Sequence, residues 1–209
     1  NFGNPPLFPN STKLICINGS HEEVEFNRAA DFNLLSDPKA FLDLLINLKK
    51  SNKWNLSRKW FDINKAKRAE WVNTSLNNLQ KTSKEKEFEG DKIHPLQLAL
   101  DVQKVMNDDD WLVIDGGNTH FWSEIAINIA GWNGKKLGGI LHPGTFSMLG
   151  VGVPFAISAK TNNPNSNVIL ISGDGAFLSG GLSIEAAFQE KKPIVVVIDN
   201  NGGLDCISQ

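Results

Sequence analysis

Short apolar runs alternate with polar and glycine-rich segments through residues 93–209. The runs at 111–114, 167–172 and 194–199 have the length of strands, and Val and Ile dominate them. Such runs are typical of parallel strands that are covered on both faces. Helical spacing occurs between them, at 96–105, from Gly152 to about Lys160, and at 182–190. The pattern predicts an α/β fold, with a parallel sheet and helices on both faces.

The N-terminal part of the chain carries a second, weaker α/β pattern. An apolar run at 14–17 predicts a short strand, and a polar stretch follows it. Asp37-Pro38 then opens a helix, because proline is tolerated in a first turn and Asp37 can cap the N-terminus with its side chain. Apolar residues at helical spacing support this helix, namely Phe41, Leu44, Leu45 and Leu48.

Residues 49–92 differ from both neighbours in charge. Between Asn47 and Glu89 there are 11 Lys or Arg residues against 5 Asp or Glu residues, interleaved with Trp54, Trp60 and Trp71. Basic patches with aromatic side chains can bind single-stranded nucleic acid. An amphipathic helical linker whose tryptophans contact neighbouring domains accounts for the same residues. We favour the linker and expect no nucleic-acid partner.

Composition narrows the class of protein without indicating a reaction. The 209 residues are 41% hydrophobic and 21% charged, with a net charge of −2, as in an ordinary globular domain. No apolar run has the length of a membrane-spanning helix, and the distant Cys16 and Cys206 form no disulfide framework. We therefore expect a cytoplasmic protein without a membrane partner. The first residues contain neither an initiator Met nor a signal peptide, so we expect a fragment.

Three turns that follow predicted strands share one composition. They are Asp115-Gly116-Gly117-Asn118-Thr119, Gly173-Asp174-Gly175 and Asn200-Asn201-Gly202-Gly203. In open parallel sheets, ligands bind at the carboxyl ends of the strands. Glycines there let backbone N–H groups approach an anion, and helix N-termini add partial positive charge. The three turns together therefore predict a site for a ligand that carries phosphate.

The type of phosphate site follows from what these turns contain. The chain has no Walker A Gly-Lys-Ser or Gly-Lys-Thr, and Gly173-x-Gly175 lacks the third glycine of a dinucleotide fingerprint. No Lys or Arg lies within the turns to neutralise a diphosphate. A hard divalent cation can do so, because Mg²⁺ binds a few protein oxygens together with phosphates. Asp174 and Asn201 are the candidate ligands.

The same motifs resemble those of the thiamine diphosphate-dependent enzymes. Gly173-Asp174-Gly175 followed by Asn200-Asn201 looks like the family's metal and diphosphate signature. Residues 142–156 are similar to the segment under the thiazolium ring in the branch of acetolactate synthase (its large catalytic subunit) and oxalyl-CoA decarboxylase. Residues 115–122 are similar to the first diphosphate loop of that branch. The resemblance implies that residues 1–48 end a middle domain, 49–92 form a linker, and 93–209 form much of the diphosphate-binding domain.

Roles for single residues come from this resemblance. Asp174, the side-chain oxygen of Asn201 and the carbonyl of Gly203 would ligate Mg²⁺. Leu149 would support the bent cofactor, and the Ser147 carbonyl would accept a hydrogen bond from its 4′-amino group. The cofactor-binding set is Gly117, Asn118, Thr119, Ser147, Leu149, Gly173, Gly175, Ala176 and Asn201.

Two further features stay open. His142 can line the substrate pocket and shuttle protons, or stabilise its loop, and we keep it with Leu149 as a catalytic candidate. We interpret His120 as structural, and the absence of an HxxxH or a cysteine pair gives no prediction of zinc. Asn18 stands where relatives often carry an acidic residue near an adenine nucleotide, which leaves the binding of FAD undecided.

The activity that the resemblance implies is decarboxylation of a 2-oxo acid followed by carboligation, such as pyruvate to acetolactate in branched-chain amino acid biosynthesis. A 2-hydroxyacyl-CoA lyase or oxalyl-CoA decarboxylase is an alternative, because Gly144-Thr145-Phe146 occurs in that branch too. A non-catalytic cofactor-binding subunit is an alternative of another class. The family takes an essential glutamate from a pyrimidine-binding domain of the same or a partner subunit. We therefore expect a homodimer or homotetramer, and an inactive fragment.

Overall fold

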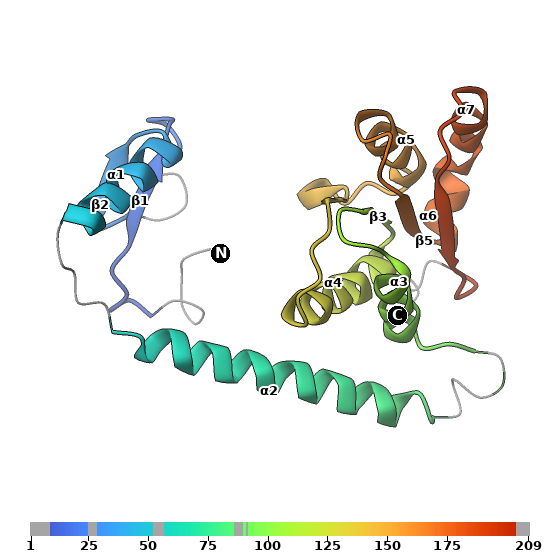
Figure 1. Ribbon diagram of the computed structural model, residues 1–209, viewed down its shortest axis with the longest axis horizontal. Helices are drawn as coiled ribbons and strands as arrows, with labels where there is room; N and C mark the ends of the chain where they lie inside the picture. The colour runs from blue at the N-terminus through green and yellow to red at the C-terminus, as the bar shows by residue number, and fades with distance from the viewer. Residues whose placement is uncertain (1–8, 25–28, 52–56, 86–89, 91, 204–209) are drawn as a thin grey trace. The chain divides into compact units, whose positions relative to one another are not determined.

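A computed structural model describes residues 9–24, 29–51, 57–85, 90 and 92–203. They form two compact units, 1–63 and 64–209. The boundary between the units falls within the expected linker 49–92. It also falls within helix α2 (Lys59–Thr82), which contributes residues to both units (Figure 1).

The N-terminal unit contains a pair of parallel strands and one helix. Strand β1 (Ile15–Asn18) confirms the strand expected at 14–17, with a shift of one residue. It pairs with β2 (Phe32–Leu35), which lies in the region that the sequence showed only as a polar stretch. Helix α1 (Pro38–Ser51) begins where predicted, and the Ala40 N–H donates to Asp37 Oδ1 at 2.8 Å. Asp37 is therefore the N-cap.

The C-terminal unit is built on a four-stranded parallel sheet in the order β4-β3-β5-β6. The strands are β3 (Trp111–Asp115), β4 (Gly139–Leu141), β5 (Val168–Gly173) and β6 (Val195–Asp199). This confirms the predicted α/β fold. Three strands lie where the apolar runs predicted them, whereas β4 lies inside a glycine-rich segment that gave no strand signal.

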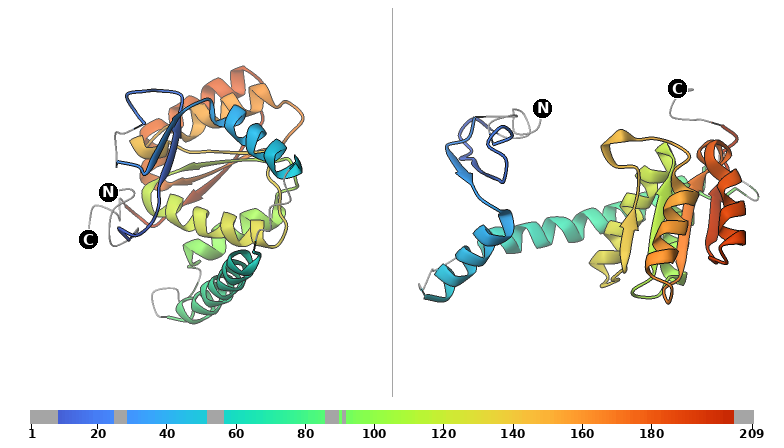
Figure 2. Two further views of the ribbon diagram at one scale, coloured as in Figure 1. Left: turned by 90° about the vertical axis from the view of Figure 1, so that its left-hand side faces the viewer. Right: turned by 90° about the horizontal axis from the view of Figure 1, so that it is seen from above.

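Helices cover both faces of this sheet (Figure 2). On one face, Leu112, Ile114 and Ile171 pack with residues of α3 (Pro95–Val105) and α4 (Gly117–Trp132). On the other, Val113 and Leu170 pack with α5 (Gly152–Asn162). Alternation along the strands sends neighbouring side chains to opposite faces, so both cores form.

The outer strand β6 is not covered on both faces, although its apolar run predicted that it would be. Val195 and Ile198 are exposed, because β6 ends the strand order and has no neighbour beyond it among the described residues. The helical region before it is also longer than the predicted 182–190. It begins with α6 (Asp174–Gly180), continues through a 3-10 turn (Gly181–Ser183) and ends with α7 (Ile184–Gln189).

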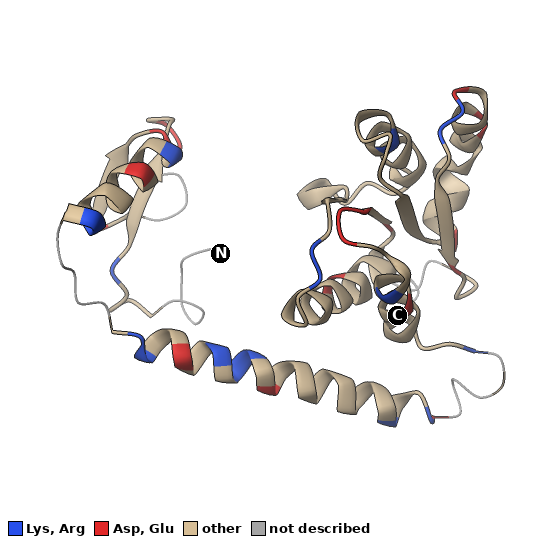
Figure 3. Ribbon diagram, in the orientation of Figure 1, with Lys and Arg blue, Asp and Glu red and all other residues tan. Residues whose placement is uncertain are grey.

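Helix α2 has a packing role in the C-terminal unit. Leu79 is buried against Leu96, Ala99 and Ala126, and Arg68 Nη2 donates to the Asn128 carbonyl at 3.2 Å. Lysine and arginine along α2 are mixed with acidic residues (Figure 3). The linker therefore contains a docked helix. Trp60 and Trp71 are exposed, and Trp54 lies outside the described residues.

Candidate active site

The three turns of like composition lie at one edge of the sheet. Strands β3, β5 and β6 run parallel, and their registers pair Asp115 with Ser172 and Gly173 with Asp199. Each turn begins where one of these strands ends, so the expected convergence of the turns is confirmed. The predicted diphosphate and metal residues thus come to a single place from segments far apart in sequence.

The first of these turns leads directly into helix α4. Gly116 has φ 121°, in the region that favours glycine, and a Cβ there would lie 3.1 Å from the Gly173 nitrogen. Gly117, Asn118 and Thr119 form the first turn of α4, and no side chain caps the helix at Gly116. Thr119 Oγ1 donates to Asp199 Oδ2 at 3.0 Å. The N-terminus of α4 is therefore packed against the ends of both β5 and β6.

The second and third turns meet at Asp174. This residue opens α6, and its Oδ1 accepts from the Gly175 N–H at 2.7 Å. Its Oδ2 accepts from the Gly202 N–H at 3.1 Å, which joins the two turns directly. Asn201 Oδ1 accepts from the Gly203 N–H at 3.2 Å. The structure thus brings the three predicted metal ligands to one corner, and Ala176 lies buried just behind it.

Asp115 anchors a fourth segment, which sequence reasoning had not connected to this residue. Its side chain is 1% exposed, and its Oδ2 accepts from the Gly152 N–H at 2.7 Å and the Gly150 N–H at 3.0 Å. Burial raises the pKa of the Asp115 carboxyl above its usual range, and these N–H groups oppose that rise only in part. The sequence offered no signal for this anchor, because the partners are backbone groups.

The segment that Asp115 holds carries Ser147 and Leu149. Ser147 has φ 49°, a left-handed backbone that follows the 3-10 turn Gly144–Phe146. Leu149 is 36% exposed, so part of its side chain is available to a ligand. The same segment contacts α6, because a Cβ on Gly180 would lie 2.0 Å from the Gly150 carbonyl oxygen. Only glycine at position 180 allows this approach.

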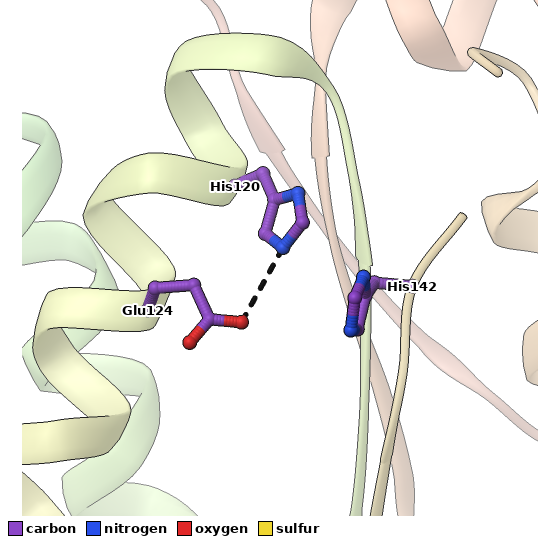
Figure 4. A group of neighbouring side chains, drawn as sticks. All are labelled: His120, Glu124 and His142. Carbon is purple, nitrogen blue, oxygen red and sulfur yellow. Dashed lines mark hydrogen bonds and ion pairs between the residues drawn. The ribbon is translucent and has the colours of Figure 1, made fainter. Parts of the chain in front are cut away.

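His142, the other catalytic candidate, follows β4 and lies beside His120 of α4. The two ring centroids are 4.7 Å apart, and the Gly144 N–H donates to His142 Nδ1 at 3.1 Å. His120 Nε2 is 3.4 Å from Glu124 Oε1, one helical turn further along α4 (Figure 4). Sequence reasoning missed Glu124, although its spacing from His120 is the four residues that place two side chains on one helix face.

Comparison with known proteins identifies a family for the region that contains the three turns. Residues 115–209 match the family model described as "Thiamine pyrophosphate enzyme, C-terminal TPP binding domain". Residues 115–209 are thus assigned to this domain of the thiamine pyrophosphate enzymes. Thiamine pyrophosphate is thiamine diphosphate, so the family resemblance of the motifs is confirmed. The match begins at Asp115, the residue at the end of β3, and includes all three turns.

Several curated relatives are enzymes of this family. Catabolic acetolactate synthase of Raoultella terrigena is 30% identical over 56% of this chain and 20% of its own length. Human 2-hydroxyacyl-CoA lyase 2 is 30% identical over 56% of this chain and 18% of its own length. Mouse 2-hydroxyacyl-CoA lyase 1 is 26% identical over 97% of this chain and 34% of its own length. The chain thus spans about a fifth to a third of these thiamine pyrophosphate enzymes.

A solved structure supports the fold independently. The thiamine diphosphate-dependent 4-hydroxybenzoylformate decarboxylase of Rhodococcus jostii RHA1 matches with a TM-score of 0.62 at 23% identity. The match covers 93% of this chain and 32% of that one. Such a likeness shows a shared fold. Among the described residues, no helix is both long and apolar enough to cross a membrane.

The expected nucleotide position lies outside this unit. Asn18 ends β1, and its side-chain oxygen accepts from the Ser20 N–H at 2.9 Å. Its amide is 3.4 Å from Glu23 Oε2. FAD binding therefore stays a prediction that nothing in this geometry tests.

Proposed function

We propose that the complete protein is a thiamine diphosphate- and Mg²⁺-dependent enzyme that decarboxylates a 2-oxo acid and joins the product to an acceptor, as acetolactate synthase does. The observation that carries this proposal is the contact between Asp174 and Gly202. It places a carboxylate and an amide from two separate turns at the strand ends, beside the N-terminus of α4.

The side chains at this corner fit a magnesium ion. Asp174 and Asn201 offer a carboxylate and an amide oxygen, and Gly203 offers a backbone carbonyl, all of them hard oxygen ligands. The hydrogen bonds that Asp174 accepts use one lone pair on each oxygen, so further lone pairs stay available to a cation. These three protein oxygens would hold the ion, and phosphate oxygens and water would supply its other ligands.

The neighbouring helix fits the diphosphate. Helix α4 begins at Gly117 with no side-chain cap, and the N–H groups of a first helical turn have no intrahelical partners. They favour an anion, and the helix dipole adds to this preference. The turns themselves contain no Lys or Arg, so a cation at Asp174 would supply the remaining positive charge.

The chain's own residues orient the ligand, and the ligand supplies the chemistry. Thiamine diphosphate, when bound, provides a nucleophilic thiazolium carbon and an electron sink for decarboxylation. Asp115 fixes the segment that carries Leu149 and Ser147, so that Leu149 can support the bent ligand and the Ser147 carbonyl can accept a hydrogen bond from its amino group. The Gly144 N–H donates to His142 Nδ1 at the start of this segment, and on this proposal His142 would line the substrate pocket.

A pyrimidine-binding domain of the same or a partner subunit would complete the site. Large apolar side chains are exposed along the helical region between β5 and β6, including Leu178 at 83%, Leu182 at 94% and Phe188 of α7. Apolar groups of this size are typical of protein contacts when they cluster at one surface. We therefore include a homodimer or homotetramer in the proposal, with the essential glutamate contributed by that domain.

Calorimetric titration of thiamine diphosphate in the presence of Mg²⁺ tests the cofactor site. Asp174→Ala and Asn201→Ala should each abolish or strongly weaken the Mg²⁺-dependent binding, because each removes one of few protein ligands. Asp101→Ala is the matched control, since Asp101 is an exposed carboxylate that pairs with Lys104 on α3. Unchanged binding in the Asp174 variant would refute the metal assignment.

A 2-hydroxyacyl-CoA lyase is the second candidate activity, and one observation favours it. Mouse 2-hydroxyacyl-CoA lyase 1 aligns over 97% of this chain, including the N-terminal unit. Assays of the complete protein with pyruvate and with a 2-hydroxyacyl-CoA separate the two activities, because the first yields acetolactate and the second an aldehyde and a shorter acyl-CoA. Cofactor binding with neither product would support a non-catalytic subunit.

A further inference from the structure

We propose that His120, Glu124 and His142 form a binding site for a divalent transition-metal ion, with Zn²⁺ as the reference ion. One possible ligand atom from each residue lies within 4.8 Å of the other two. The three side chains point toward a common space between α4 and the segment after β4 (Figure 4). The proposal rests on these side chains alone, and it shares one residue, His142, with the proposed enzymatic function.

The spacing on α4 suits a tetrahedral ion. His120 Nε2 and Glu124 Oε1 are 3.4 Å apart. Two ligands at about 2.0–2.1 Å from a tetrahedral Zn²⁺ lie about 3.3 Å from each other, so this pair already has the separation that the ion requires. As a hydrogen bond the same distance is long, because nitrogen–oxygen hydrogen bonds are usually about 2.7–3.2 Å. An ion would therefore displace only a weak contact.

The ligand types select the class of metal. Imidazole nitrogens suit Zn²⁺ and its transition-metal neighbours, whereas Mg²⁺ prefers oxygen ligands. Two histidines and one glutamate leave a fourth tetrahedral position open to water or to a ligand. All three side chains are partly buried, which shields the site without closing it. This site therefore differs in chemistry from the all-oxygen site proposed at Asp174.

Metal binding should also act on the segment that leads to Ser147. The Gly144 N–H now donates to His142 Nδ1. A metal on Nε2 puts the ring proton on Nδ1, and a metal on Nδ1 occupies its lone pair, so in either case the ring can no longer accept this hydrogen bond. Occupancy would thus free the Gly144 N–H at the start of the 3-10 turn, and its hydrogen exchange should accelerate.

Titration of Zn²⁺ into the purified protein tests the site, with excess Mg²⁺ present and thiamine diphosphate omitted. We expect one saturable equivalent of Zn²⁺, and visible absorption typical of four-coordinate Co²⁺ when Co²⁺ replaces it. His120→Asn, Glu124→Gln and His142→Asn should each weaken binding by at least about 10-fold, since even outer-shell partners contribute this much. His21→Asn, which changes an exposed histidine of the other unit, should leave binding unchanged.

Asp174→Ala distinguishes this site from the proposed magnesium site. It should leave Zn²⁺ affinity unchanged, even though it is expected to abolish Mg²⁺-dependent cofactor binding. Loss of Zn²⁺ binding in Asp174→Ala would place the ion at the other site and overturn the proposal. The proposal would also be overturned if the folded wild-type protein failed to bind Zn²⁺, or if the three ligand variants bound it with wild-type affinity. The cluster would then be only a His120–Glu124 contact with the His142 ring beside it.

Discussion

Replacing Asp115 separates two roles that a buried carboxylate can have, as a charge and as a hydrogen-bond acceptor. Asp115→Asn removes the charge and keeps one acceptor oxygen. Asp115→Ala removes both. Because the Gly150 and Gly152 N–H groups both reach the same oxygen, Oδ2, the single oxygen of asparagine can serve both donors. The two variants are therefore expected to differ sharply in stability.

The size of each effect follows from the contacts. Alanine leaves two N–H groups unpaired, and a buried donor without a partner costs about 1–3 kcal/mol, which gives about 2–6 kcal/mol in the free energy of unfolding. At pH 7, the free energy of unfolding of Asp115→Asn should be higher than that of the wild type, or lower by no more than about 1 kcal/mol. The reason is that a buried charge that is not fully compensated opposes folding. The raised pKa of the Asp115 carboxyl indicates such incomplete compensation.

The pH dependence has a definite sign. Since the folded pKa of Asp115 is raised, the native state holds this proton more tightly than the unfolded chain does. The resulting stability is complete below the unfolded pKa of about 3.9 and is lost as the pH rises through the folded pKa. The difference between Asp115→Asn and the wild type should therefore shift in favour of the variant from about pH 4 upward.

Urea unfolding followed by tryptophan fluorescence at several pH values measures these differences. Asp101→Asn provides a control of opposite sign, because hydrogen bonds from Lys104 and Gln97 lower the pKa of the exposed Asp101. Its stability should fall slightly behind the wild type as the pH rises toward about 4. If Asp115→Asn proves as destabilising as Asp115→Ala at every pH, the charge or the second oxygen is essential and the reasoning is wrong.

Substitutions at two further positions, Gly180 and Asp37, test contacts with the backbone, and each has its own comparison variant. Gly180→Ala should destabilise the C-terminal unit by about 2 kcal/mol or more, because the new Cβ would meet the Gly150 carbonyl, whereas Gly131→Ala in α4 has open space and should stabilise by about 0.5–1 kcal/mol. Thermal unfolding of the pair measures both signs. Asp37→Ala should lower the stability of α1 by about 0.5–2 kcal/mol through loss of the Ala40 contact, and Asp37→Ser should restore most of it in circular dichroism melts.

The sequence predicted those elements whose local pattern of apolar residues matches their place in the folded sheet. Strands β3, β5 and β6 carry continuous apolar runs and lie within one residue of their predicted positions. Strand β4 was missed because Gly138-Gly139 looks like a loop. A Cβ at Gly139 would lie 2.4 Å from the Trp111 ring, so this glycine reflects close packing against β3 rather than a turn.

Some contacts of the candidate site could likewise be predicted from the sequence, and others could not. Asp174 and the Asn200–Gly203 turn could be placed together from the sequence, because parallel strands end at a common edge. The link from Asp115 to Gly150 and Gly152 could not, since any residue presents a backbone N–H and the partners lie 35 and 37 positions away. Glu124 carried a usable signal in its spacing from His120, but His142 joins them only through the pairing of β4 with β3.

The contact between Gly150 and Gly180 joins the segment that carries Ser147 to the helix that carries Asp174. The two backbones are in direct contact there, so a displacement of one segment must displace the other. No side chain lies between them that could absorb the movement by changing its rotamer. The two segments should consequently open as one cooperative unit. Their amide protons should then exchange with a common opening free energy, even though about 30 residues separate them in the sequence.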